Sequence, residues 1–292
     1  MSQSSFGNKF KVTTWGESHG KALGAVIDGC PAGLPLCEED IQKFLDRRKP
    51  GQSRYTTARK EGDLVEILSG VFEGKTTGTP ISLMVRNTDQ RSRDYGNIAY
   101  SYRPGHADYT FDQKYGFRDY RGGGRSSGRE TIGRVAAGAI ASKILGELGI
   151  SICTYTKSIG PVEISSFNKE EINQNAFYMP DAQAAVKAGE YLEECMKNQD
   201  SAGGVIECRI TGTPAGLGEP VFDKLSALLA HALMSIGAVK AVEIGDGIAV
   251  TSSNGSTDND GFTVKDGEII KTSNHAGGIM GGISDGSEII LR

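Results

Sequence analysis

The stretch RGGGRSSGRETIGRVAAGAIASKILGEL, residues 121–148, changes character in its middle. Its first fourteen positions hold four arginines and three consecutive glycines. From Ser127 onward, apolar residues recur at helical spacing, at positions 132, 135, 136, 139, 140, 144, 145 and 148. We predict a helix here, and Ser126 or Ser127 can cap its first turn.

The arginines of this stretch are the first functional signal. The whole chain is mildly acidic, with a formal net charge of −4, so the local positive charge is no general bias. The arginines are interleaved with glycine and serine and lead into a helix start, where unpaired backbone N–H groups attract anions. Arginine also forms paired hydrogen bonds to phosphate and carboxylate. We therefore predict an enzyme with a polyanionic, phosphate-bearing small ligand rather than a solvated basic face.

The elements on both sides of this stretch indicate a mixed fold. Upstream we predict strands at 10–15 and 21–29, a helix at 37–49, a hairpin or meander over 63–87 and an irregular segment over 87–124. Downstream we predict helices at 181–199 and 220–236, strands at 203–212, 241–247 and 287–292, and a glycine loop at 274–286. Helices and strands that alternate irregularly, with hairpins, are typical of an α+β fold. No linker divides the sequence, so we expect one domain over 1–292.

Composition excludes several classes of protein. The slight negative charge argues against a nucleic-acid binder, and no window approaches the about 18 apolar residues of a membrane span. The N-terminal residues lack the apolar stretch of a signal peptide. The five cysteines are scattered, so we expect reduced thiols in a cytoplasmic protein. The four histidines show no metal-ligand spacing, and we predict no metal.

Two short motifs point to other functions. GESHG, residues 16–20, matches the G-x-S-x-G pattern of serine hydrolases, in which the serine lies on a turn from a strand to a helix. The residues that follow favour a strand, so the context is wrong; a hydrolase with Ser18 as nucleophile is kept as the alternative function. GVFEGKT, residues 70–76, is one residue short of a phosphate-binding P-loop.

The histidines are the candidates for proton transfer, because imidazole titrates near neutral pH. His19 and His106 each lie in a short polar segment beside glycine, where a ligand can approach. His231 lies within an apolar helical pattern, so we expect it to be structural. The fourth histidine, His275, lies in the glycine loop.

Several segments together resemble the chorismate synthase family: GESHGKALGAVIDGCPAG (16–33), LDRRKPGQSRYTTARKEGD (45–63), NTDQRSRDY (87–95), RPGHADYT (103–110), GRSSGRETIGRVAAGAIA (124–141) and NHAGGIMGGIS (274–284). The resemblance runs in order from Phe6 to Arg292. It implies a sandwich of antiparallel sheets around core helices, assembled as a homotetramer. It also implies an anti 1,4-elimination that converts 5-enolpyruvylshikimate 3-phosphate to chorismate and phosphate. That reaction requires reduced FMN, with NADPH as a candidate reductant.

The resemblance also implies roles for individual residues. His19 and His106 match the two catalytic histidines, of which one protonates the flavin and the other the departing phosphate. The positions that match the substrate site are Ser18, Arg48, Arg54, Arg103 and Arg129. Those that match flavin contacts are Arg125, Ser126, Ser127, Gly237, Ala238 and Gly281. A substrate with one phosphate and two carboxylates, beside a flavin phosphate, explains why so many arginines are needed.

One departure from the family concerns the end of the sequence. Chorismate synthases continue through a Lys-Pro-Thr loop and an Arg-His-Asp-Pro segment, whereas this sequence ends at SEIILR. We therefore expect a shortened form that binds FMN weakly and has little activity. We also expect its last strand to lack a partner, and such an open edge favours aggregation.

Overall fold

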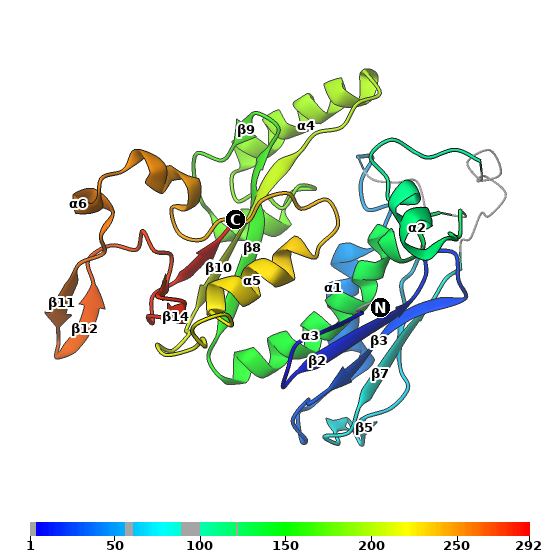
Figure 1. Ribbon diagram of the computed structural model, residues 1–292, viewed down its shortest axis with the longest axis horizontal. Helices are drawn as coiled ribbons and strands as arrows, with labels where there is room; N and C mark the ends of the chain where they lie inside the picture. The colour runs from blue at the N-terminus through cyan, green and yellow to red at the C-terminus, as the bar shows by residue number, and fades with distance from the viewer. Residues whose placement is uncertain (1–3, 56–60, 89–99, 121) are drawn as a thin grey trace. The chain divides into compact units, whose positions relative to one another are not determined.

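The computed structural model describes residues 4–55, 61–88, 100–120 and 122–292 (Figure 1). The chain forms two compact units, Met1–Ile144 and Leu145–Arg292. Each unit has its own antiparallel sheet and its own apolar core. The mixture of helices and antiparallel sheets confirms the predicted α+β class. The assignment of residues 1–292 to a single domain stays a prediction.

The first unit is built on a five-stranded sheet in the order β1-β2-β3-β7-β4. Its strands are β1 (Ser5–Phe6), β2 (Lys11–Gly16), β3 (Ala22–Asp28), β4 (Val65–Ile67) and β7 (Ile81–Arg86), and β5 (Val71–Phe72) and β6 (Lys75–Thr76) form a separate hairpin. Alternate residues of β3 and β7 are buried, and they face each other in the register Leu23–Val85, Ala25–Leu83 and Ile27–Ile81. This period of two gives the sheet one apolar face.

Two helices cover that face, α1 (Glu38–Arg48) and α3 (Thr131–Glu147) (Figure 1). Ile41 and Leu45 of α1 and Ile132 and Ile140 of α3 are fully buried in the same core as the strands. The helix predicted from the opening stretch is confirmed, but it begins later than expected. The 3₁₀ turns Gly124–Ser126 and Gly128–Glu130 come first, and Ser127 caps the second by accepting a hydrogen bond from the backbone of Arg129.

Two glycines of α3 differ in what surrounds them, which gives a stability prediction. A Cβ on Gly133 would lie 2.8 Å from the carbonyl oxygen of Gly24 and 3.0 Å from Thr14 Cγ2, whereas a Cβ on Gly138 would meet no atom within 4 Å. We expect Gly133→Ala to lower the free energy of unfolding by about 1–3 kcal/mol, because strand backbone cannot easily move. Gly138→Ala should raise it by about 0.5–1 kcal/mol through helix propensity. Urea unfolding tests both, and equal effects at the two positions would contradict the packing described here.

The second unit contains a four-stranded sheet in the order β15-β10-β8-β9. These strands are β8 (Ser151–Ile159), β9 (Val162–Glu163), β10 (Gly204–Thr211) and β15 (Ile289–Leu291). The helices are α4 (Ala182–Lys197), α5 (Leu225–Met234) and α6 (Gly255–Asp258), and the two hairpins pair β11 (Phe262–Lys265) with β12 (Glu268–Lys271) and β13 (Ile279–Met280) with β14 (Ile283–Ser284). Leucines of α5 pack with Ile289 and Leu291 of β15.

Two local predictions need correction. Residues 241–247 do not form a strand: Gly245 and Gly247 have positive φ, and only Ile244 makes an isolated bridge to Leu291. The segment 87–124 is not wholly irregular, because it contains α2 (Asp108–Tyr115).

The last strand does have partners. β15 pairs with β10 on one side, and on its other side the backbones of Glu243 and Gly245 bond to Arg292 and Ile290. The expectation of an unpaired terminal strand is therefore wrong. Within the described ranges, no helix combines the length and the apolar character that crossing a membrane requires.

Candidate active site

Ser18 and His19 lie in the turn that joins β2 to β3. Ser18 is buried, and its Oγ lies 3.1 Å from Nδ1 of His19. The turn connects two antiparallel strands and leads into no helix. The strand-to-helix turn that a serine hydrolase requires is therefore missing at GESHG, and nothing supports the hydrolase alternative.

Gly122 brings a second segment against His19. A Cβ on Gly122 would lie 2.3 Å from Nδ1 of His19, and the residue has a φ of +93°. Only glycine fits here, because a side chain would both clash and strain the backbone. The carbonyl oxygen of Gly122 accepts a hydrogen bond of 2.8 Å from Nη2 of Arg103. Arg103 and His19, both predicted from the sequence, therefore both contact Gly122. Arg103 does so by a hydrogen bond and His19 by close packing.

Arg103 is in turn bound to His106 and to Asp108, the first residue of α2. Its Nη2 lies 3.2 Å from Nδ1 of His106, and its Nε and Nη2 donate to the two carboxylate oxygens of Asp108 at 2.8 Å. These hydrogen bonds from Arg103 hold the pKa of the Asp108 carboxyl well below its usual range. The path His19–Gly122–Arg103–His106 therefore joins both predicted catalytic histidines within the first unit.

Arg48 and Arg129 form a buried cluster with two carboxylates. Nη1 of Arg48 lies 2.6 Å from Asp63, and Nη2 of Arg129 lies 3.1 Å from Asp63 and 3.4 Å from Glu61. The side chains of Glu61 and Asp63 are fully buried. Burial lowers the pKa of the Arg48 guanidinium. These two arginines, expected to face ligand anions, are thus already paired with acids of the chain.

Glu61 and Asp63 were not identified from the sequence. The available signal was their place in KEGD, directly after the arginine-rich segment 47–59. Among the described residues, Nη1 of Arg129 is buried and has no hydrogen-bond acceptor. A buried guanidinium N–H without an acceptor is costly, and an anion of a ligand would satisfy it.

The other predicted residues of the first unit have different surroundings. Arg125 donates to the carbonyl oxygen of Gly16 and to the hydroxyl of Thr14, so its side chain contacts β2. Ser126 donates to the carbonyl oxygen of Gly123. Arg54 is exposed and donates to the hydroxyl of Tyr55.

Gly237, Ala238 and Gly281 belong to the second unit. Gly237 and Ala238 follow α5, and Gly281 lies in the turn between β13 and β14. Both glycines are exposed, and a Cβ on Gly237 or Gly281 would meet no atom within 4 Å. Ala238 has a positive φ of 69°, which is unusual for a residue with a side chain.

A buried ionic cluster holds the segment that leads to Gly281. Nζ of Lys271 lies 2.9 Å from Asp260 and 2.8 Å from Asp285, and it donates to the side chain of Asn274. Asp260 accepts hydrogen bonds from the backbone N–H groups of His275 and Ala276. Side chains therefore help to fix the glycine loop, together with its backbone hydrogen bonds.

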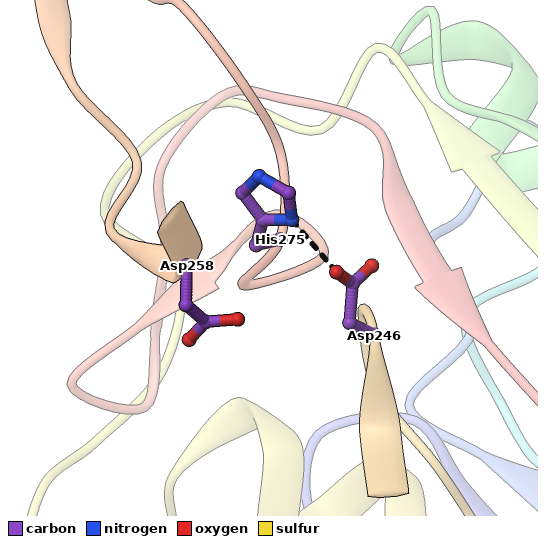
Figure 2. A group of neighbouring side chains, drawn as sticks. All are labelled: Asp246, Asp258 and His275. Carbon is purple, nitrogen blue, oxygen red and sulfur yellow. Dashed lines mark hydrogen bonds and ion pairs between the residues drawn. The ribbon is translucent and has the colours of Figure 1, made fainter. Parts of the chain in front are cut away.

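Asp246, Asp258 and His275 form a further group of potential ligands (Figure 2). One ligand atom from each lies within 4.8 Å of the others, and these are ligand types that divalent ions use. However, Nδ1 of His275 already lies 2.7 Å from the carboxylate of Asp246. The prediction that the protein needs no metal stays a prediction.

The His275–Asp246 pair gives a prediction for pH dependence. The hydrogen bond to Asp246 raises the pKa of His275 above its ordinary value. The pair therefore stabilises the fold fully below the unfolded value of about 6.5, and this contribution is lost as the pH rises through the raised pKa. We expect Asp246→Asn to return the pKa of His275 towards its ordinary value, as measured by NMR titration. Asp258→Asn is the control and should have a smaller effect, since Asp258 makes no bond to the ring. A titration of His275 that Asp246→Asn leaves unchanged would contradict this account.

Comparisons with known proteins agree with one another. The sequence profile of the family described as chorismate synthase matches residues 10–292. The chorismate synthase of Agathobacter rectalis is 66% identical over 294 residues, and that of Chloroflexus aggregans is 56% identical over 293. Both alignments cover 100% of this chain and 80% of the relative. A solved crystal structure of a chorismate synthase superposes with a TM-score of 0.82 at 34% identity, covering 97% of this chain and 84% of that one.

Proposed function

This chain belongs to the chorismate synthase family, and from that membership we propose how its residues carry out the reaction. The enzyme is a lyase that converts 5-enolpyruvylshikimate 3-phosphate to chorismate and phosphate. We propose His19 and His106 as its proton-transfer groups. The observation that carries this proposal is the path through Gly122 and Arg103, which places both imidazoles along one continuous set of contacts.

The substrate anions are proposed to bind at the arginines of the first unit. The buried Nη1 of Arg129, which no described residue satisfies, supports a ligand oxygen at that position. Arg103 and Arg48 are held by Asp108 and Asp63, so their guanidinium planes are fixed before a ligand arrives. Such preorganisation lowers the cost of binding. Ser18 and Arg54 remain part of the proposed substrate site.

We propose reduced FMN as the cofactor. The positions proposed to contact it are Arg125, Ser126 and Ser127 in the first unit and Gly237, Ala238 and Gly281 in the second, each taken from its match to the family's flavin contacts. The backbone at Gly237 and Gly281 is uncovered, which leaves room for a ligand at each of these positions. When bound, reduced FMN would lend electron density to the substrate so that phosphate leaves without net oxidation or reduction. The residues of the chain would bind and orient both molecules, exclude water and supply protons.

The test is anaerobic turnover. Photoreduced FMN and 5-enolpyruvylshikimate 3-phosphate are added to the chain, and chorismate absorbance and released phosphate are followed together. We expect equal amounts of the two products, and none when FMN is omitted. Product formed without any flavin would overturn the cofactor proposal. Replacing photoreduction by NADPH decides whether the chain reduces its own flavin.

We also propose a homotetramer in the cytoplasm. All five cysteines are free, which agrees with a reducing compartment. The hairpin β11–β12 exposes Phe262, Val264 and Ile269 at 60%, 68% and 76% of their surfaces. Apolar side chains gathered in this way are typical of an interface.

The hairpin gives a prediction for assembly. Val264 and Ile269 face each other across β11–β12. We expect the double variant Val264→Lys, Ile269→Lys to sediment as a smaller species than the parent tetramer, because two buried charges are unfavourable in an apolar interface. The matched control is Glu268→Lys on the same hairpin. A parent chain that sediments as a monomer would contradict the proposed tetramer.

A further inference from the structure

Asp108 is a buried carboxylate whose contact with His106 the proposed mechanism has not used. It is the first residue of α2, and its side chain is 4% exposed. Oδ2 accepts hydrogen bonds from the backbone N–H of Arg103 at 3.1 Å and from its Nε at 2.8 Å. Oδ1 accepts from Nη2 of Arg103 at 2.8 Å and lies 3.1 Å from Nη1 of Arg118. Both oxygens are thus occupied by donors from positively charged side chains.

The same oxygen of Asp108 also faces His106. Oδ1 lies 3.0 Å from Nδ1 of His106, and Nη2 of Arg103 lies 3.2 Å from that nitrogen. A protonated Nδ1 forms an ion pair with Oδ1 of Asp108, and an unprotonated Nδ1 can accept a hydrogen bond from Nη2 of Arg103. In either state Nδ1 is turned toward this pair, which leaves Nε2 as the nitrogen that exchanges a proton with a ligand.

We propose that Asp108 is a positioning residue for the elimination reaction, which acts by holding Arg103 and His106 so that proton transfer takes place at Nε2 of His106. The inference rests on the proposed role of His106. It follows the same logic as a carboxylate that orients the histidine of a catalytic triad. Asp108 touches no reacting atom in this scheme, since its two oxygens are bonded within the chain.

Asp108 is also connected to His19, indirectly through Arg103 and Gly122. Arg103, which Asp108 holds by three hydrogen bonds, also donates to the carbonyl oxygen of Gly122, and Gly122 lies against His19. A shift of Arg103 would therefore move the backbone that packs on His19. Asp112 differs, although it lies on the same helix: it bonds Nε of Arg118 and makes no contact with either histidine.

The experiment compares Asp108→Asn with the matched control Asp112→Asn. An amide cannot accept from Arg103 and His106 through both of its polar atoms. We expect Asp108→Asn to lower kcat by up to about 10⁴-fold, the loss that the same change of the orienting carboxylate gives in a serine protease. Asp112→Asn should change kcat by less than about 3-fold, because Arg118 keeps Asp108 as a partner and Asp108 keeps its contacts with Arg103 and His106.

A readout without ligand separates positioning from general damage. In acidic buffer the protonated imidazole of His106 should show an Nδ1–H proton in the NMR spectrum that exchanges slowly with water, assigned by its loss in His106→Gln. We expect Asp108→Asn to abolish this resonance and Asp112→Asn to keep it. If Asp108→Asn does not fold, Asp108→Glu retains the charge and should keep the resonance with a partial loss of kcat.

The outcomes are distinguishable. Asp108→Asn with the parent kcat and an intact Nδ1–H resonance would overturn the inference. Parent turnover in His106→Gln would instead overturn the proposed role of His106, while the resonance would still report whether Asp108 holds the ring.

Discussion

His106→Ala should convert 5-enolpyruvylshikimate 3-phosphate about 10²–10⁴-fold more slowly than the parent chain, as the loss of a general acid–base group does. The imidazole is held by Arg103 and Asp108 within a fixed set of contacts. Alanine removes the proton donor and leaves the Arg103–Asp108 pair in place. Binding of reduced FMN together with substrate should therefore survive. The measurement is single-turnover kinetics with a parallel binding titration.

The control for this prediction is His231→Gln. His231 is exposed on α5 and is not among the residues proposed to bind ligands or transfer protons. Its turnover should equal that of the parent. If His106→Ala also turns over at the parent rate, His106 has no acid–base role, and His19 becomes the remaining candidate.

Arg129→Ala should lower the free energy of unfolding by about 3–5 kcal/mol, since it removes one partner from a buried ion-pair cluster. The carboxylates of Glu61 and Asp63 are fully buried beside this guanidinium, and alanine leaves their charge less compensated. The folded variant should also show weaker substrate binding, by about 2–5 kcal/mol, if the missing side chain bonds a ligand anion. Urea unfolding gives the first quantity and the Michaelis constant gives the second.

Arg134→Ala is the matched control. Arg134 lies in the first turn of α3, directly after the 3₁₀ turn that contains Arg129. Arg134 bonds Glu130 at 2.8 Å, but its side chain is 37% exposed. A partly exposed pair of this kind contributes about 0–1 kcal/mol. Equal destabilisation by Arg129→Ala and Arg134→Ala would mean that burial of the Arg129 cluster is not what stabilises it.

Local periodicity accounts for the parts of the fold that could be predicted. The alternation in β3 and the helical spacing in α3 are carried by residues close in sequence, and both elements lie within the predicted ranges, although α3 begins later than its pattern indicates. The predicted strand at 241–247 fails because glycines with positive φ at 245 and 247 interrupt its extended backbone. α2 was missed because Asp108 is its one buried residue, so it has no apolar stripe to detect.

The residues of the candidate site likewise fall into those that the sequence identified and those that it did not. His19, His106 and the arginines were identifiable, because their residue types and glycine-rich surroundings suit anions and protons. Glu61, Asp63 and Asp108 were not, because an acid in a polar segment looks like an ordinary surface charge. Only the fold shows that they are buried. Arg129, for example, pairs with Asp63, which lies 66 positions earlier in the sequence. Tertiary pairing of this kind leaves no periodic trace.

The ionic cluster of Lys271, Asp260 and Asp285 makes the stability of the glycine loop depend on pH. Burial alone would raise the pKa of Asp260 and lower that of Lys271, but the hydrogen bonds and charges around them outweigh burial and shift both in the opposite direction. The contribution of Asp260 is therefore present above its unfolded pKa and lost as the pH falls through the depressed one. The contribution of Lys271 is present below its unfolded pKa and is lost as the pH rises through its raised pKa.

The backbone amides of His275 and Ala276 bond to Asp260 rather than to a sheet. They should open together to hydrogen exchange outside the pH range in which both Asp260 and Lys271 are charged. We therefore expect the glycine loop to unfold locally at these pH values. The amides of the neighbouring strands should remain protected from hydrogen exchange.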